Sequence, residues 1–390
     1  MKLDIDHLRQ ETPGCNDRIH FNNAGAALQP RPVTQAHLDH LLLEQRIGGY
    51  EAANASTPAS ENFYHAFAGL LNCTPNEIAF TDSGSRAWIQ LLLSIPFKRG
   101  DRVLTGEAEY ASNYMALLHL ARQYDLRIEV IPNVDGCLCL STLEKKLDDD
   151  VRLVALTHVP SQSGSIQPAQ EVGQLLRDHR ALYLLDVSQS AGQLKLDVEE
   201  LGCDLLTGSG RKFLRGPRGT GFIYTRHSIL EHLVPPAIDL QAAAWIDRDS
   251  YELRHDARRF ELWEHSVAAK IALGVAADYA VQLGMETIEQ RVRQLAAHLR
   301  AALAEVPGVH IHDKGLQLGA IVTFSKDNIA ATSLQQKLQE QHINTSVVKL
   351  ANTRLDPAIQ KLGDINRASL HYYNTEAEIE HFCAVLRTLY

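Results

Sequence analysis

The sequence predicts an α/β protein with a large domain on a mostly parallel sheet and a smaller α+β domain after it. Between about residue 60 and residue 225, short apolar runs alternate with segments of helical periodicity, a pattern typical of buried parallel strands in βαβ units. Beyond residue 225, long helical segments precede a mixed region of shorter strands, which favours an α+β domain. We expect residues 16–260 to form the large domain and residues 1–15 with 261–390 to form the small one.

In the first region, the apolar runs alternate with segments whose apolar residues have helical spacing. The expected strands are 78–80, 102–104, 127–132, 151–159 and 181–187, and the expected helices are 85–95, 114–124 and 168–180. In the second region, the expected helices are about 260–283, 286–305 and 376–389, and the expected strands are 318–325, 343–348 and 367–373. This order is that of a doubly wound sheet followed by a smaller mixed domain.

Composition and charge narrow the classes of function. The chain has 390 residues, 45% hydrophobic and 22% charged, as in ordinary globular proteins. Its 38 basic and 47 acidic residues give a net charge of −9 without a basic cluster, so we expect no nucleic-acid partner. No apolar run approaches the ~18 residues that cross a bilayer, and the first residues lack the apolar core of a secretory signal. We therefore expect a cytoplasmic protein without membrane contacts.

The cysteines and histidines do not indicate a disulfide framework or a metal site. The six cysteines are too few and scattered to form such a framework. Cys137 and Cys139 lack a second pair, and His310 and His312, on one face of an expected strand, lack a third ligand. We expect reduced cysteines and no bound metal.

Polar residues lie at two strand ends, after the run 181–185 and within residues 204–221, and the carboxyl ends of strands are where doubly wound sheets bind ligands. Asp186 follows the run 181–185; it is costly to bury unless a cation meets it, although alone it is more typical of a helix N-cap. Ser209, Arg211 and Lys212 lie in a glycine-rich segment without Walker A spacing. The hydroxyl and the guanidinium suit a phosphate, and burial beside Arg211 would lower the pKa of the Lys212 amine and make it nucleophilic.

Two further strand ends carry residues suited to the same ligand. Gly84 and Ser85 open a helix directly after an expected strand. Backbone N–H groups there bind anions, although alone these residues are more typical of a helix cap. Tyr110 lies between the next strand and its helix, where its ring is suited to stack on a flat ligand.

One ligand explains all four strand ends: pyridoxal 5'-phosphate. Its aldehyde requires a lysine such as Lys212, and its ring nitrogen requires a carboxylate such as Asp186 to stay protonated. Its phosphate suits a helix N-terminus with hydroxyl groups, and its ring face suits an aromatic side chain. None of the four motifs is diagnostic alone, and together they predict a pyridoxal phosphate enzyme.

The segment 186–224 resembles the class V aminotransferase group of fold-type I pyridoxal phosphate enzymes, which includes cysteine desulfurases, isopenicillin N epimerase and C–S lyases. Their Ser-Gly-His-Lys motif, followed by Gly-Pro, is matched by residues 209–212 and 216–217. The resemblance implies that the cofactor is attached to Lys212 and that Asp186 pairs with its ring nitrogen.

The same resemblance implies further roles along nearly the whole chain. Gln189 is expected to contact the ring hydroxyl and Ser209 the phosphate. The segment that begins at Arg367 resembles the one whose arginine holds the substrate α-carboxylate, and the segment around Asn23 resembles one that lines the active site. Because fold-type I sites form at a dimer interface, the resemblance also implies a homodimer.

Four positions depart from the family pattern. Tyr110 stands where many relatives place a histidine over the cofactor ring, and Arg211 replaces the usual histidine before the lysine. Trp263 and Glu264 replace a Gly-Thr pair that reaches the phosphate of the neighbouring subunit. The contact between subunits at the phosphate is therefore not predicted for this chain.

The cysteine distribution bears on the reaction. A desulfurase of this group requires a mobile small-domain cysteine that accepts sulfur, but no cysteine lies between Cys203 and Cys383, and the corresponding loop, 347–354, contains none. Desulfurase chemistry by that route is therefore not expected. Elimination of a β-substituent, epimerisation and transamination all begin with removal of the Cα proton by Lys212, and that lysine alone fits all three.

Residues 209–222 and 258–274 together most resemble ergothioneine-pathway lyases that cleave hercynylcysteine sulfoxide. Such a lyase releases pyruvate, ammonia and a sulfenic acid. The favoured interpretation is therefore a pyridoxal phosphate-dependent C–S lyase whose small-molecule substrate is an S-substituted cysteine or its sulfoxide. An amino-acid epimerase or racemase and an aminotransferase of the same family remain alternatives.

Overall fold

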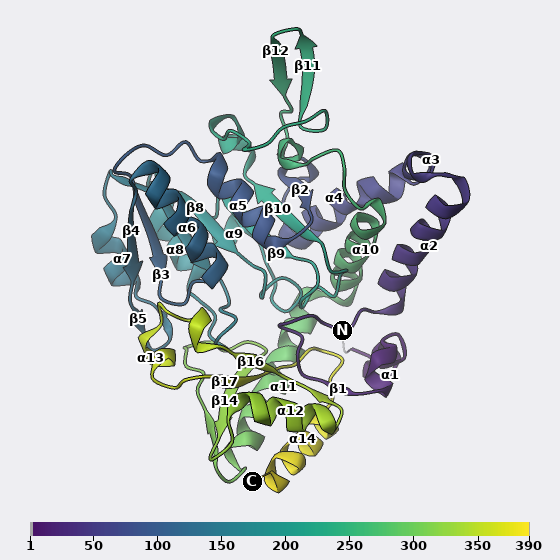
Figure 1. Cartoon of the computed structure of the whole chain (residues 1–390), viewed down its shortest axis with the longest axis vertical. Coiled ribbons are helices and arrows are strands. Elements are labelled where there is room, and N and C mark those ends of the chain that lie inside the picture. The colour runs from purple at the N-terminus through teal and green to yellow at the C-terminus, as the bar shows by residue number, and fades with distance from the viewer. Residues whose placement is uncertain (1–2, 390) are drawn as a thin grey trace.

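The computed structural model describes residues 3–389, and it forms a large α/β domain with a smaller α+β domain below it (Figure 1). The large domain holds a seven-stranded sheet in the order β2-β10-β9-β8-β7-β3-β4. Strand β10 is antiparallel to both neighbours, and the pairs from β9 to β4 are parallel. The bounds of the strands are β2 (Ile78–Thr81), β3 (Arg102–Gly106), β4 (Arg127–Ile131), β7 (Val151–Thr157), β8 (Leu182–Asp186), β9 (Leu205–Ser209) and β10 (Gly221–Thr225). The predicted mostly parallel sheet is confirmed.

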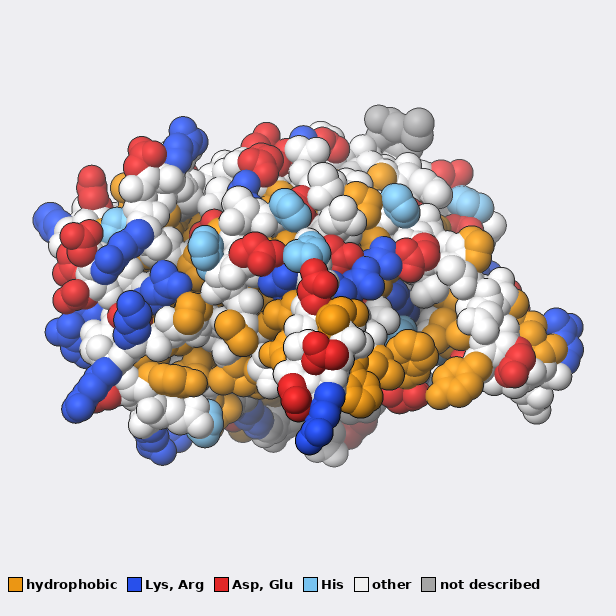
Figure 2. Space-filling view, turned by 90° about the horizontal axis from the view of Figure 1, so that it is seen from above, with side chains coloured by type: hydrophobic (Ala, Val, Ile, Leu, Met, Phe, Trp, Pro, Cys, Tyr) orange, Lys and Arg blue, Asp and Glu red, His pale blue; other side chains and the backbone are white. Residues whose placement is uncertain are grey.

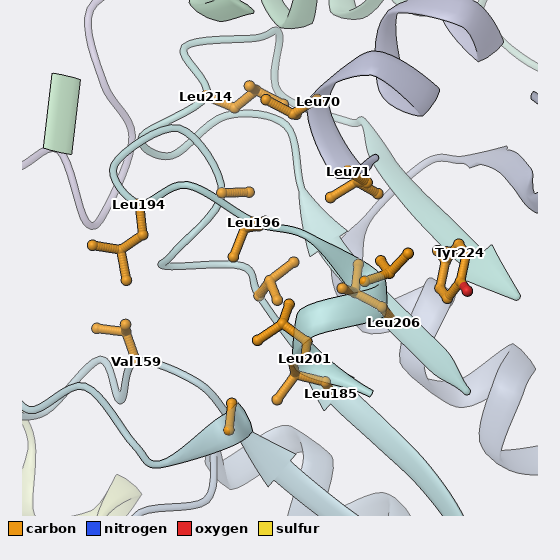
Figure 3. Close-up of a cluster of buried hydrophobic side chains, with 14 of the residues drawn as sticks. Leu70, Leu71, Val159, Leu185, Leu194, Leu196, Leu201, Leu206, Leu214 and Tyr224 are labelled. Atoms are coloured by element: carbon orange, nitrogen blue, oxygen red, sulfur yellow. The ribbon is translucent and has the colours of Figure 1, made fainter. Parts of the chain in front are cut away.

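Both faces of this sheet are buried, which explains the nearly continuous apolar runs of its strands. Successive strand residues point to opposite faces, so Leu184 and Leu205 pack in one hydrophobic cluster and Leu185 and Leu206 in the other. Figure 3 shows part of the second cluster, which Tyr224 joins. The helices on the two faces are α4 (Thr57–Leu71), α5 (Gly84–Ser94), α6 (Ala111–Tyr124), α7 (Leu140–Lys146), α8 (Ala169–Leu176) and α9 (Val198–Leu201).

The small domain is built on a four-stranded antiparallel sheet in the order β13-β14-β17-β16. Its core joins helices to this sheet and includes an edge-to-face contact of Phe324 with Phe382, whose ring centroids lie 5.8 Å apart. The elements are α11 (Met285–Ala304), β13 (Val309–Ile311), β14 (Ile321–Lys326), α12 (Ala331–Glu340), β15 (Ile343–Asn344), β16 (Ser346–Val348), α13 (Pro357–Gln360), β17 (Ile365–Ser369) and α14 (Glu376–Thr388).

The packing moves both expected domain limits. Helix α10 (Val267–Leu283) packs on α4 and on α2 (Arg31–Ile47), and its Leu273 and Ala277 belong to the large-domain core. The large domain therefore extends past residue 260 to the break at Gly284. In the other direction, β1 (Ile19–His20) pairs with β15, and Phe21 lies in the small-domain core. These residues were expected in the large domain, but their apolar partners lie in the small one.

Three smaller features complete the fold. Helices α1 (Ile5–Gln10) and α3 (Gly49–Ala55) flank α2, and β5 (Asn133–Val134) pairs with β6 (Cys137–Leu138). A hairpin of β11 (Ala243–Asp247) and β12 (Ser250–Leu253) projects from the top of the large domain (Figure 1). In the part of the chain that the structure describes, no single helix is long and apolar enough to cross a membrane; α10 and α11 meet the requirements of length and composition only as a pair bent by 81°.

Candidate active site

The candidate site lies at the carboxyl ends of the central parallel strands. Asp186 is the last residue of β8, and in register with it lie Thr157 at the end of β7 and Thr207 of β9. Ser209 ends β9, and Lys212 follows three residues later. The structure thus brings Asp186 and Lys212 to the same edge of the sheet, as expected from the strand pattern.

Lys212 is buried, and its ammonium nitrogen lies 5.8 Å from the centroid of the Tyr110 ring. Burial, opposed by the charge of Asp186 and assisted by the positive charges of Arg211 and Arg367, lowers the pKa of Lys212 to about 7. Because the neutral amine is the nucleophilic and basic form, Lys212 is available for covalent attachment and for proton transfer near neutral pH.

The carboxylate of Asp186 is fixed by two hydrogen bonds. Its Oδ1 accepts from the backbone N–H of Ser188 at 2.8 Å, and its Oδ2 accepts from the Asn113 side-chain amide at 2.9 Å. Asn113 also donates to Glu109, a fully buried carboxyl whose pKa is raised by burial. Asn113 lies in the first turn of α6. The sequence interpretation did not select it as a site residue, although its position shortly after an expected strand indicated one.

A second buried group behind the site is His158, which directly follows β7. Its backbone N–H donates to the Asp186 carbonyl at 3.0 Å, and its Nδ1 lies 3.0 Å from the Ser190 hydroxyl. Burial lowers the pKa of His158 to about 4. The ring is therefore neutral, and this residue, which the sequence interpretation did not select, positions the backbone of Asp186.

The N-terminus of α5 forms an anion cradle beside the end of β9. Ser83 caps the helix by accepting from the Arg86 N–H, and Gly84 is its first residue. A Cβ at Gly84 would collide with the hydroxyl of Ser209 and lie 3.0 Å from that of Ser188. Backbone N–H groups and two hydroxyls therefore converge on a space that only glycine leaves open, which suits a phosphate. Gly84 and Ser209 lie together as predicted, Ser188 was not predicted, and Ser85 is exposed on the next position of the helix.

Gln189 provides an unused polar atom between the cradle and the cavity described next. Its Nε2 donates to the Ala24 carbonyl at 3.1 Å, and within residues 3–389 its buried Oε1 has no hydrogen-bond partner. A buried acceptor without a partner is costly, and the ring hydroxyl of pyridoxal phosphate is a donor that matches it. Together with Lys212, Asp186 and the Gly84 cradle, this atom shows that the residues present fit the cofactor.

A cavity of about 230 Å³ opens on Lys212 from the side of the small domain. Its lining comes from the N-terminal segment, the large domain and the small domain, and consists of Ala24, Gly25, Tyr110, Ser161, Gln162, Gln189, Arg211, Lys212, Ser346, Val347, Val348, Lys349, Asn352, Thr353 and Arg367. Tyr110 precedes α6 and lies in this lining together with Lys212; its stacking on the cofactor ring stays a prediction. The apolar Val347 and Val348 form one wall.

Arg367 enters the cavity from β17. Its Nη1 donates to the Ser161 carbonyl at 2.8 Å and its Nη2 to Asn22 Oδ1 at 3.4 Å, while its buried Nε has no partner within the described residues. Burial lowers the pKa of Arg367 to about 10, and Arg211 adds to the shift, so the guanidinium stays charged at neutral pH. A carboxylate in the cavity would find this cation facing it.

Two predicted site residues have different surroundings from those expected. The Asn23 side chain is fully buried outside the cavity, where it donates to the Ser369 carbonyl at 2.8 Å. It positions Ala24 and Gly25, which do line the cavity. Arg211 was expected at the phosphate, but it lies in the cavity and donates to the Gly25 carbonyl at 2.7 Å. Side-chain direction in the turn after β9, which spacing does not reveal, accounts for the second difference.

Comparisons with known proteins agree with this site. Residues 19–382 match the family model "Aminotransferase class-V". A relative named probable cysteine desulfurase from Methanothermobacter thermautotrophicus is 27% identical over 96% of this chain and 95% of its own length. The apo structure of a cysteine desulfurase from Thermococcus onnurineus NA1 superposes with a TM-score of 0.91 at 27% identity, covering 99% of this chain and 98% of that one.

A structure of the cystine C–S lyase C-DES in complex with its reaction product cysteine persulfide superposes with a TM-score of 0.88, covering 97% of this chain and 99% of that one. At 23% identity, this likeness shows the fold alone. These three proteins are named for cysteine desulfuration or cystine cleavage, and they do not support the narrower resemblance to ergothioneine-pathway lyases. With a family match over most of its length and residues that fit the cofactor, the chain belongs to the class V aminotransferase family and is a pyridoxal phosphate-dependent enzyme of fold type I.

Proposed function

We propose that this enzyme is a C–S lyase that cleaves the Cβ–S bond of an S-substituted cysteine or its sulfoxide. With one water, the products are pyruvate, ammonium and a thiol, or a sulfenic acid when the substrate is a sulfoxide. The observation that carries the proposal is the composition of the cavity lining: the small-domain segment in it is Ser346, Val347, Val348 and Lys349, and no cysteine is among the described residues of the lining. Because this lining offers no thiol to accept it, the sulfur atom of the substrate leaves the cavity still bonded to its own substituent.

The six cysteines support this interpretation. Cys15, Cys137, Cys203 and Cys383 are buried, and burial raises the pKa of Cys203 and Cys383 above the usual range of a thiol. The other two, Cys73 and Cys139, also lie outside the cavity lining. A buried neutral thiol is a poor acceptor of sulfur. Hydrogen bonds with Ser141 and Thr142 lower the pKa of Cys139 to about 7, but this thiol lies outside the cavity lining, so the chain differs in the position of its cysteines from a desulfurase that uses its own cysteine.

The residues divide the work of the reaction. When bound, pyridoxal phosphate supplies an electron sink for the charge that develops at Cα. Asp186, held by Asn113 and Ser188, provides the carboxylate for its ring nitrogen, and the Gly84 cradle with Ser209 would hold its phosphate. Each of these contacts uses a group that the fold has already oriented.

On the substrate side, Arg367 would hold the α-carboxylate through its guanidinium fork. The neutral amine of Lys212, favoured by a pKa of about 7, removes the Cα proton. Val347 and Val348 would receive the sulfur substituent and limit the access of water. Position and protonation state therefore favour proton removal followed by loss of the β-substituent.

The proposal is tested by product analysis with the purified holoenzyme. S-methyl-L-cysteine sulfoxide and S-benzyl-L-cysteine should release pyruvate, detected with lactate dehydrogenase, in equimolar amount with ammonium. Alanine formed from L-cysteine, with loss of activity when one cysteine is replaced, would contradict the proposal in favour of a desulfurase. Deuterium exchange at Cα without pyruvate would favour an epimerase, and turnover that requires a keto acid would favour an aminotransferase.

The proposed assembly is a homodimer. The top face carries exposed apolar side chains between charged ones (Figure 2), and Trp245, Tyr251 and Trp263 are each more than half exposed. Trp263 and the exposed Tyr50 line a groove of about 540 Å³, and exposed apolar surfaces of this kind mark protein interfaces. Light scattering should give a mass twice the 43.3 kDa of the chain, and the mass of one chain would contradict this assembly.

A further inference from the structure

The cavity beside Lys212 has an excess of positive charge that one substrate carboxylate does not balance. Arg211, Lys349 and Arg367 line it together with Lys212, and no aspartate or glutamate is among the described residues of that lining. This contrasts with the net charge of −9 of the whole chain. The positive charge is thus a local property of the cavity and not of the protein surface in general.

The three cations are not equivalent. Lys349 pairs with Asp364 at 3.0 Å, whereas Arg211 and Arg367 donate to neutral oxygens, those of Gly25, Ser161 and Asn22. The two guanidiniums also lie close enough that the charge of Arg211 lowers the pKa of Arg367. Two guanidiniums that have no carboxylate partner within residues 3–389 share one partly buried space and repel each other, and this arrangement favours a ligand with more than one negative charge.

The cofactor and the amino-acid moiety of the substrate do not use both groups. The phosphate cradle at Gly84 and Ser209 lies outside the cavity lining. An amino acid brings one α-carboxylate, which Arg367 of β17 holds in the proposed function. Arg211 comes from a different element, the turn that carries Lys212, and its guanidinium remains for a second anion.

We propose that Arg211 binds an acidic group on the sulfur substituent, so that the preferred substrate is an S-substituted cysteine with a second carboxylate. This inference rests on the proposed C–S lyase activity and adds the chemical class of the leaving group. Arg211 is then a specificity-determining residue. Arg367 binds the α-carboxylate, which all amino acids share, and Arg211 binds the acidic group of the sulfur substituent, which leaves with the sulfur atom.

The first test compares two substrates of nearly equal shape, S-carboxymethyl-L-cysteine and its neutral amide, S-carbamoylmethyl-L-cysteine. In the wild-type holoenzyme, kcat/KM for pyruvate release should favour the acid by about tenfold or more, as expected for one charge-assisted pair. In Arg211→Gln this preference should fall toward one, and Arg211→Lys, which keeps the charge, should retain part of it. The matched control is Arg218→Gln, an exposed arginine of the same loop outside the cavity, and it should retain the full preference.

The second test measures binding without turnover. Adipate has the same spacing between carboxylates as S-carboxymethyl-cysteine, and hexanoate replaces one of its carboxylates with a methyl group. Calorimetry on the holoenzyme should show adipate binding about tenfold more tightly than hexanoate, with the difference lost in Arg211→Gln and kept in Arg218→Gln.

The outcomes separate the two proposals. Equal pyruvate release from the acid and the amide, unchanged in Arg211→Gln, would overturn the role of Arg211 and leave the lyase activity standing. Absence of pyruvate from every S-substituted cysteine, with adipate still preferred in an Arg211-dependent manner, would overturn the proposed reaction and leave the acidic subsite standing.

Discussion

Replacement of Arg367 by lysine separates the geometry of the carboxylate contact from its charge. The guanidinium can offer two parallel N–H groups to a carboxylate, whereas an ammonium is a point charge on a more flexible stem. In the structure Nη1 and Nη2 are already positioned by Ser161 and Asn22, and the buried Nε has no partner in the described part of the chain. The fork is therefore oriented before substrate arrives, and lysine would lose that orientation.

The expected cost follows from the hydrogen bonds at stake. A hydrogen bond to a charged group contributes about 1.5–3 kcal/mol, so loss of one or both arms of the fork costs ~2–4 kcal/mol, or ~30- to 1000-fold in kcat/KM. Because the same contact aligns the Cα–H bond with Lys212, KM should rise and kcat should fall together.

Steady-state kinetics on an S-substituted cysteine measure this effect, with the absorbance of the bound cofactor as the control for an intact site. The absorbance should not change, because the contacts of Lys212 and Asp186 are untouched. A competing explanation would pair Arg367 with a surface carboxylate such as Asp364, but that carboxylate binds Lys349. An unchanged kcat/KM in Arg367→Lys would refute the carboxylate contact.

Three other predictions concern the cofactor pocket and the cysteines. Covalent capture of pyridoxal phosphate by the apoprotein, measured by stopped-flow absorbance, should become faster as pH rises through about 7 and level off above it. The reason is that the pKa of Lys212 is lowered to about 7 and only the neutral amine reacts. A capture rate that still increases up to pH 9 would contradict the lowered pKa. Asp186→Asn should retain the cofactor and lose about 100-fold or more in kcat, since a neutral amide does not keep the ring nitrogen protonated; wild-type turnover in this variant would remove that role from Asp186. Replacement of all six cysteines by alanine or serine should leave C–S cleavage within about tenfold, or ~1.4 kcal/mol, provided that circular dichroism shows a folded protein, and loss of activity traced to a single cysteine would revive the desulfurase mechanism.

The parts of the fold and site that depend on local pattern were predictable from the sequence. Apolar runs marked the strands because both sheet faces are buried, and the end of a run marked Asp186 because a parallel sheet brings such ends to one edge. Lys212 was found in the same way, from a glycine-rich segment directly after a strand. In each case the decisive information lies within about ten residues of the chain.

The parts that depend on side-chain direction or on distant packing were not predictable. Asn113 holds Asp186 through a contact between separate strand ends, which no spacing reveals. Asn23 turns inward to the Ser369 carbonyl, 346 residues away in the chain. Helix α10 lies after residue 260, where the small domain was expected to begin, but it packs against α2 and α4 of the large domain.

The pairing of β1 with β15 has a consequence for the order in which the protein is made. Ile19 pairs with Ile343, and Asn22 forms a bridge with Ser369, so a strand made at the start of synthesis has no partner until almost the whole chain has left the ribosome. Contacts of such long sequence separation form late. The nascent chain can therefore complete the edge with Asp186 and Lys212 well before it can complete the substrate cavity with Arg367. A ribosome-bound chain that ends near residue 300 is expected to have a cofactor edge but no carboxylate contact, and substrate recognition is the last property that this protein acquires.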